Sequence, residues 1–331
     1  MDALMFSLNA ILPIVLLIVL GYILKKKAFL EESWFKKGNK LIFRICLPCL
    51  LFINVYNIES FAAIDWFVVI YAQIAVLVLA MLGYILVKFT IPDDRQKGVV
   101  MQCTFRANFA IIGLPLAEAL GGAEAVGIAA VLGAFCIPSF NILAIISQTI
   151  FLKKEGGKKS GVKDILLQIV KNPLIIGVAG GMVALGIRAF LPVGADQLPV
   201  FSLKEDIPFL YNAFNNVGKM CAPLSLVILG GLFDFGVIKN MFRPILLGTV
   251  SRILFVPLMT LGSALLLKID YVAFPALLAL FGAPVAVSSV PMAQEMNNDS
   301  VLAGQLVVWT SIFSIFTLFV FILVMRMTGI L

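Results

Sequence analysis

The sequence has 331 residues, of which 61% are hydrophobic and only 13% are charged. A soluble domain carries about 25% charged residues, so the composition excludes a water-soluble globular protein and predicts an integral membrane protein. The sequence contains no histidine, and its net charge of +7 comes from lysines in short loops between apolar runs. We therefore expect no enzyme activity, no cofactor, no metal site and no nucleic-acid partner.

Ten apolar runs follow one another along the chain, and each is close to the roughly 20 residues that a helix needs to cross a bilayer. We expect an all-α polytopic membrane protein with helices near residues 4–24, 40–57, 64–88, 97–120, 123–152, 165–190, 208–233, 243–268, 271–295 and 300–326. The longest polar segment, residues 153–164, lies between the fifth and sixth runs. It is predicted to be a cytoplasmic linker between two five-helix halves, residues 1–152 and 165–331.

Loop charges predict the orientation in the membrane. Lysine and arginine cluster after the first, third, fifth and seventh runs, whereas acidic residues dominate most of the intervening loops. Because positively charged loops remain in the cytoplasm, both termini are expected outside. Arg188 and Lys204 lie on the outer side in this topology and are exceptions to the pattern.

Weak internal similarity relates the two halves. Residues 44–48 align with residues 219–223 at an offset of 175, and each segment holds a basic residue, a cysteine and a proline. In the fourth and ninth runs, two alanines, a phenylalanine and a proline align at an offset of 176. With five runs in each half, a duplicated unit must be inverted in the membrane. The sequence therefore predicts two inverted five-helix repeats.

The fourth and ninth runs carry glycine and proline at corresponding places. These residues include Gly113 and Pro115 in the fourth run, and Pro284 and Pro291 in the ninth. Proline removes a helix hydrogen bond, which a membrane tolerates only where protein or a water-filled cavity covers the freed groups. The pattern predicts crossed, broken helices 4 and 9 whose ends bind an anionic substrate. The alternative is that these prolines only bend the helices.

Polar residues beside the predicted breaks are candidates for substrate binding. Asn108 offers an amide, Ser288 and Ser289 offer hydroxyls, and Arg106 offers a positive charge. Each has a second interpretation that the sequence leaves open. Asn108 would otherwise join two helices, the serines would bond to their own helix, and Arg106 would extend toward the membrane surface.

Two glutamates lie near the ends of the broken runs, and no acidic pair is found at the predicted crossing of the two runs. Glu118 follows Pro115 by three residues, and Glu295 follows Pro291 by four. Either glutamate is a candidate for proton coupling, and the alternative is a charge at a helix end. Because cations outnumber carboxylates within the runs, an anionic substrate is expected.

The fourth run contains the motif Asn108-x-x-x-x-Gly-x-Pro-Leu, and Gly121 ends the run. This motif resembles the fourth helix of the auxin efflux carrier family, which includes the plant PIN proteins. Residues 293–297, together with Asp299, are similar to the cytoplasmic end of that family's ninth helix. The ten-helix layout and the short central loop resemble bacterial members, including malate and malonate permeases.

The resemblance implies an elevator-type secondary transporter. Its transport domain, near residues 64–152 and 243–326, would move against a scaffold near residues 4–57 and 165–233. Homodimerisation through the scaffold helices and a location in the bacterial inner membrane are also implied. The substrate would be a small organic anion such as malate, malonate or an auxin-like acid.

The resemblance also implies roles for individual residues. Asn108 would contact the substrate carboxylate, and Pro115 and Pro291 would form the crossing. Where the plant carriers have an asparagine in the ninth helix, this chain has Pro284, Ser288 and Ser289. Two other functions stay open from the sequence: a sodium- or proton-coupled carrier of the bile-acid symporter type, and a membrane sensor or channel that transports nothing.

Overall fold

The computed structural model describes residues 2–57, 65–152, 167, 170–190, 201–234, 236 and 238–331. Within these ranges every named element is helical, and the one extended pairing found there is an isolated antiparallel bridge between Ala107 and Val285. This confirms the predicted all-α class. The predicted linker at residues 153–164 lies outside the described residues.

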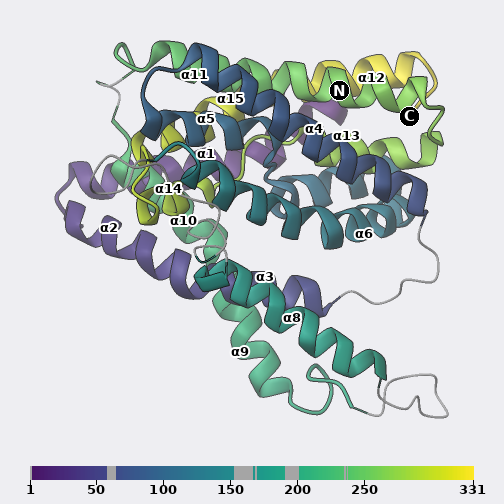
Figure 1. Cartoon of the computed structure of the whole chain (residues 1–331), viewed down its shortest axis with the longest axis horizontal. Coiled ribbons are helices and arrows are strands. Elements are labelled where there is room, and N and C mark those ends of the chain that lie inside the picture. Colours follow the sequence, from purple (N-terminus) through teal and green to yellow (C-terminus); the bar gives the residue numbers. More distant parts are fainter. Residues whose placement is uncertain are drawn as a thin grey trace.

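The first half of the chain forms a succession of helices (Figure 1). In chain order they are α1 (Asp2–Lys26), α2 (Glu32–Leu41), the π-helical η1 (Ile42–Cys46), α3 (Leu47–Tyr56), α4 (Trp66–Thr90), α5 (Asp94–Phe105), the π-helical η2 (Phe109–Gly113) and α6 (Leu114–Thr149). Gly122 interrupts α6 with a φ of 61°, a left-handed conformation that glycine adopts without strain. The interruption lies between the predicted fourth and fifth runs.

The second half is built in the same way. Its elements are α8 (Pro173–Phe190), α9 (Pro208–Lys219), α10 (Cys221–Leu232), α11 (Phe242–Val250), the π-helical η3 (Ser251–Phe255), α12 (Val256–Leu266), the 3₁₀-helical η4 (Tyr271–Ala273), α13 (Phe274–Gly282), α14 (Ser289–Glu295) and α15 (Ser300–Met327). Asp65, Asp93 and Asp299 cap helices α4, α5 and α15, respectively. Each accepts a hydrogen bond from a free N–H group of the first turn, which fixes where the helix begins.

Several helices have the length and composition of membrane spans. Within the described residues, five continuous helical segments qualify: Glu32–Tyr56, Trp66–Thr90, Phe109–Thr149, Phe242–Leu266 and Ser300–Met327. Pro173–Arg188 and Tyr271–Gly282 are shorter apolar helices. These segments support a multi-pass membrane protein, and the count of ten spans stays a prediction.

Three proline-containing spans continue through their prolines because a π-helical turn precedes each one. The π-helical segments are η1, η2 and η3, and the prolines that follow their last residues by two positions are Pro48, Pro115 and Pro257. Proline has no N–H group, and its ring clashes with the carbonyl four residues earlier. A π turn bonds residues five apart and so widens the helix at this point. The helical segment therefore continues through each of these prolines.

The helices pack in two groups that meet along one side (Figure 1). In the first group, α3 packs on α8 and α9, and α10 packs on α1, α2 and α9. In the second group, α4, α5, α6 and α11–α15 contact one another, and α1 of the first group also reaches α15. Helices α1 and α10 approach to backbone contact: a Cβ atom on Gly21 would lie 1.8 Å from the Val227 carbonyl oxygen, and one on Gly230 would lie 1.8 Å from that of Ile18. Small residues permit this close packing in a membrane.

Candidate functional site

Two helices are interrupted in the middle of the second group. Helix α5 ends at Phe105, and Arg106 continues in an extended conformation with φ −91° and ψ 102°. Helix α13 ends at Gly282, and Ala283 is likewise extended, with φ −62° and ψ 147°. The chain becomes helical again at η2 and at α14. Each interruption thus leaves backbone groups without their helical partners.

The two interruptions lie against each other and share backbone hydrogen bonds. The N–H group of Asn108 donates to the Pro284 carbonyl at 2.8 Å, and that of Ala286 donates to the Arg106 carbonyl at 3.3 Å. These bonds flank the antiparallel bridge between Ala107 and Val285. We call residues 106–108 and 283–288 the crossing. Part of the backbone that each break exposes is satisfied by the other break.

The crossing does not lie at the prolines that were expected to form it. Pro115 is exposed near the start of α6, and Pro291 is buried in the first turn of α14. Pro115 follows the π turn of η2 within a continuous helical segment, whereas Pro291 lies where the N–H groups of a helix have no helical partner, so each proline is tolerated. Gly113 lies in η2, where a Cβ atom would come within 2.5 Å of the Phe109 ring and 2.9 Å of the Ala279 carbonyl oxygen. Gly113 therefore allows close helix packing.

A cavity of about 70 Å³ opens beside the crossing. Arg106, Asn108 and Ser288 line it from the crossing, and Asn54 of α3 and Ser225 of α10 line it from the first group of helices. The three crossing residues were predicted as site residues, and the structure brings them together. Asn54 and Ser225 were not predicted, because no local sequence pattern links α3 or α10 to the broken helices.

Arg106 is held in place by four side chains. Its Nη2 donates to Oγ of Ser288 at 2.9 Å and to Oδ1 of Asn141 at 3.0 Å, while Nη1 faces Oε1 of Gln102 at 3.3 Å and the sulfur of Met292 at 3.0 Å. All four groups are neutral, and the residue is only 3% exposed. The positive charge of Arg106 is therefore fixed beside the cavity without a carboxylate partner among these contacts.

Asn108 keeps its amide group free for a further contact. The side chain is 5% exposed, and its Nδ2 atom is buried with no hydrogen-bond partner in the described part of the chain. Buried polar groups are normally paired, so an unpaired donor beside a cavity suggests a ligand contact. The alternative was that the Asn108 amide joins two helices, and among the described residues Nδ2 makes no hydrogen bond that would do so.

The two serines of the ninth run have different surroundings. Ser288 accepts the hydrogen bond from Arg106 and lines the cavity, whereas Ser289 is buried and donates to the Ala286 carbonyl at 2.7 Å. Ser289 thus follows the alternative expected for a serine that bonds within its own segment. Pro284 lies in the crossing, where its carbonyl accepts from Asn108.

The two candidate coupling glutamates lie away from the cavity. Glu118 is exposed on α6. Glu295, at the end of α14, forms an ion pair with Arg44 of η1, with Nε of the arginine 3.2 Å from Oε2 of the glutamate. Neither glutamate lines the cavity at the crossing.

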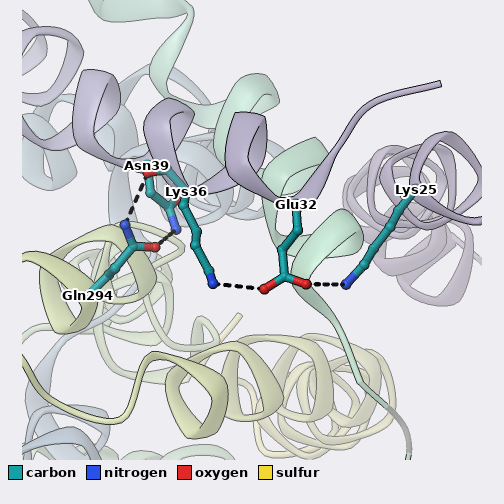
Figure 2. A network of polar contacts seen from close by, with 5 residues as sticks. All are labelled: Lys25, Glu32, Lys36, Asn39 and Gln294. Carbon is teal, nitrogen blue, oxygen red and sulfur yellow. Dashed lines mark hydrogen bonds and ion pairs between the residues drawn. The ribbon is translucent and has the colours of Figure 1, made fainter. Parts of the chain in front are cut away.

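Further polar contacts join α14 to α2 beside this ion pair. Figure 2 shows that Gln294 faces Asn39, which donates to Oε1 of Gln294 at 2.9 Å, and Nε2 of Gln294 donates to the Lys36 carbonyl at 3.1 Å. Glu32 of α2 forms ion pairs with Lys36 of the same helix at 2.8 Å and with Lys25 of α1 at 3.7 Å. We call the contacts of Gln294 and Glu295 with α2 and η1 the α14–α2 contact.

A second, larger cavity adjoins the first. Its volume is about 880 Å³, and it shares Leu51, Asn54 and Phe109 with the smaller cavity. Most of its lining is apolar, and the acidic residues on it are Asp65, Glu124 and Asp270. The large cavity lies between α3 on one side and α4 and α6 on the other.

Within the described residues, no group of three or more histidine, cysteine, aspartate or glutamate side chains is arranged to hold a metal ion. The chemistry of the cavity is that of a positive charge, an amide and hydroxyl groups on mainly apolar walls. Groups of this kind on apolar walls can bind and orient a polar ligand.

Sequence comparison identifies the family of the chain. Residues 6–322 match the family described as membrane transport protein. The chain belongs to this family. Membership confirms the resemblance to the auxin efflux carriers, and it identifies a membrane transporter. Within the family, the chain is 25% identical over 258 residues to an uncharacterized transporter of Methanocaldococcus jannaschii, a match that covers 72% of this chain and 76% of that relative.

Proposed function

We propose that the protein is a secondary transporter for small organic anions, namely carboxylates such as malate, malonate or auxin-like acids. The observation that carries the proposal is the cavity at the crossing, where the buried guanidinium of Arg106 and the unpaired amide of Asn108 line one space. A carboxylate would accept hydrogen bonds from both groups. Bonds to an ionised acceptor are shorter and about twice as strong as neutral ones.

The charge of the buried residues favours an anion over a cation. Among the described residues, the buried charged side chains are Arg106 and Arg252, and no aspartate or glutamate is buried. A cationic substrate in the small cavity would meet an uncompensated positive charge in a medium of low polarity. An anionic substrate would neutralise it, which offsets the cost of keeping arginine in the membrane.

The size of the cavity favours a small polar head group. A water molecule needs about 10–15 Å³ of comparable volume, so about 70 Å³ holds roughly five to seven groups of this size. A carboxylate with two or three further carbon or oxygen atoms fills this space. Larger acids would extend from the crossing into the adjoining cavity of about 880 Å³, whose walls are mainly apolar.

The position of the small cavity supports alternating access by an elevator mechanism. The crossing lines it from one group of helices, and α3 and α10 line it from the other. We propose that the spans near residues 4–57 and 165–233 form a scaffold, through which two copies dimerise. The spans near 64–152 and 243–326 would carry the substrate past this scaffold.

The breaks also support the inverted repeat that such a mechanism uses. With the offset of 176 between the fourth and ninth runs, residues 106–108 correspond to residues 282–284, and both segments lie at interruptions. We propose ten spans in two inverted halves, residues 1–152 and 165–331. Both termini would lie outside a bacterial inner membrane.

In this orientation the structure would be open to the outside. Asp65, Glu124 and Asp270 belong to loops expected outside, and all three line the large cavity. On the predicted cytoplasmic side, the α14–α2 contact holds Gln294 and Glu295 against the first group of helices. Movement of the crossing toward the cytoplasm would break this contact.

The membrane potential would be sufficient to drive export. With the interior negative, each negative charge that leaves the cell gains about 2.3 kcal/mol per 100 mV. Among the described residues that line the small cavity, there is no carboxylate that would carry a coupled proton or sodium ion. This lining supports uncoupled efflux of a monoanion.

Flux measurements on purified protein in liposomes test the proposal. Radiolabelled malonate, malate and indole-3-acetate would be followed at a fixed potassium diffusion potential, with and without sodium or a pH gradient. Asn108→Ala should abolish the flux, whereas Asn212→Ala, at an exposed position on α9, should leave it unchanged. Equal flux in the Asn108→Ala protein would contradict the site. Strict dependence on sodium would instead favour a coupled symporter, and conductance far above carrier turnover would favour a channel.

A further inference from the structure

Arg252 is a second buried arginine, and the sequence pattern did not single it out. It lies in η3 with an exposed fraction of 0%. Its Nε donates to the Ala283 carbonyl at 2.8 Å, and its Nη2 donates to the carbonyls of Phe281 and Leu280 at 3.0 Å and 3.3 Å. One guanidinium therefore bonds to three carbonyls at the end of α13.

These carbonyls lack helical partners because of the break. The Leu280 carbonyl would bond to the N–H group of residue 284, which is a proline and has none. The Phe281 carbonyl would bond to Val285, whose N–H group faces Oγ1 of Thr310 at 3.3 Å instead. Unpaired carbonyls are costly inside a membrane. Arg252 supplies the hydrogen bonds that the interruption at Pro284 removes.

Arg252 also compensates an unfavourable helix charge. The carboxyl end of a helix carries about half a negative charge, and both α5 and α13 end at the crossing. Uncompensated, these ends would weaken the binding of an anion there. Arg106 follows the end of α5 directly in the chain, whereas the arginine at the end of α13 is Arg252, which belongs to η3. The guanidinium of Arg252 bonds directly to the carbonyls that end α13, whereas that of Arg106 bonds to side chains beside the cavity.

We propose that Arg252 is a positioning residue of the transport site. It fixes the end of α13 so that Pro284 and Ala286 meet residues 106–108, and it cancels the negative end of α13 beside the bound anion. Arg252 is not among the residues that line the cavity, so it acts through the crossing and not by touching the substrate. The first part of this role concerns the structure alone, and only the second rests on the proposed function.

Hydrogen–deuterium exchange tests the structural part on the full-length protein in detergent micelles. Arg252→Met keeps an unbranched apolar stem and removes the donors and the charge. The backbone amides of Asn108 and Ala286, which bond across the crossing, should exchange about tenfold faster or more, as expected when a hydrogen bond to a charged group is lost. Amides of α1 and α10 should keep the wild-type rate. The matched control is Thr260→Val, which removes a buried hydroxyl that bonds within α12.

Arg252→Lys keeps the charge but offers a point donor that does not span three carbonyls. In Arg252→Lys, the amides of Asn108 and Ala286 should exchange at rates between those of wild type and Arg252→Met. If the methionine variant does not fold, the lysine variant tests the positioning role. Wild-type exchange at Asn108 and Ala286 in a folded Arg252 variant would overturn the proposal, as would equal acceleration in Thr260→Val.

Malonate binding, measured by titration of the melting temperature, tests the second part. The dissociation constant for malonate should rise several-fold in Arg252→Met and stay unchanged in Thr260→Val. Unchanged affinity in Arg252→Met would overturn the electrostatic role. If neither malonate nor indole-3-acetate binds wild-type protein, the proposed function fails, while the exchange measurement still decides the positioning role.

Discussion

Replacement of Arg106 by glutamine separates a binding role from a structural one. The variant removes the positive charge but keeps an amide donor near Ser288 and Asn141. A sphere of about 70 Å³ has a radius of about 2.6 Å, so a carboxylate in the cavity lies within about 4–5 Å of the guanidinium that lines it. At about 4 Å and an effective dielectric constant near 20, two unit charges attract by about 4 kcal/mol, which is an upper limit.

The expected loss of affinity is smaller than this limit. A hydrogen bond to a charged group contributes about 1.5–3 kcal/mol net, which corresponds to roughly a 10- to 150-fold change in the dissociation constant. Folding should respond differently, because a neutral amide is easier to bury in a membrane than a guanidinium with no carboxylate partner. We therefore expect Arg106→Gln to bind the substrate anion roughly 10- to 150-fold more weakly, with an unchanged or higher melting temperature.

Isothermal titration calorimetry with malonate and indole-3-acetate measures the affinity, and differential scanning fluorimetry measures the melting temperature. Arg326→Gln is the matched control, since Arg326 is exposed in the last turn of α15. Wild-type affinity in folded Arg106→Gln protein would refute the role of Arg106 in anion binding. A large fall in melting temperature with unchanged affinity would show that the residue serves the fold alone.

Two further predictions concern the packing and movement of the helices. Gly230→Ala would place a Cβ atom 1.8 Å from the Ile18 carbonyl oxygen, where real contacts are not below 3.0 Å. It should destabilise the protein by about 1–3 kcal/mol, measured by thermal unfolding, whereas Gly262→Ala, with nothing within 4 Å, should not; equal melting temperatures would contradict the packing. Gln294→Ala should loosen the α14–α2 contact and favour the state closed to the outside. A cysteine introduced at Ala130, in the large cavity, should then react more slowly with an impermeant maleimide in a background without native cysteines, and unchanged labelling would show that the contact does not stabilise the open state.

The sequence was sufficient to predict the class of the protein and the region of the site. Apolar runs of about 20 residues have few stable alternatives to helices in a membrane, because backbone groups there must bond within the segment. Arg106 and Asn108 stood out for the same reason, since polar side chains are costly in such runs. The sequence did not distinguish Ser288, which lines the cavity, from Ser289, which bonds within its own segment, because both roles are compatible with the same sequence.

The location of the breaks was predicted only approximately. Proline was a guide to a disturbed helix, but Pro115 is accommodated by the π turn of η2, and Pro291 by the first turn of α14. The chain leaves the helix several residues before each of them, where the other broken segment offers hydrogen bonds at Ala107 and Val285. Sequence patterns describe the loss of bonds within one helix but not their replacement by a distant one.

The sequence by itself determined that this chain spans a membrane as helices, and it identified the membrane transport family through a motif around Asn108. Both follow from local properties, namely apolar length and the spacing of a few residues. Only the tertiary structure decided that Arg106, Asn108 and Ser225 share one cavity and that Arg252 completes the end of α13. Those contacts join helices far apart in the chain, and they form because carbonyl and amide groups freed by a break in a membrane must find partners on whichever helix packs beside them.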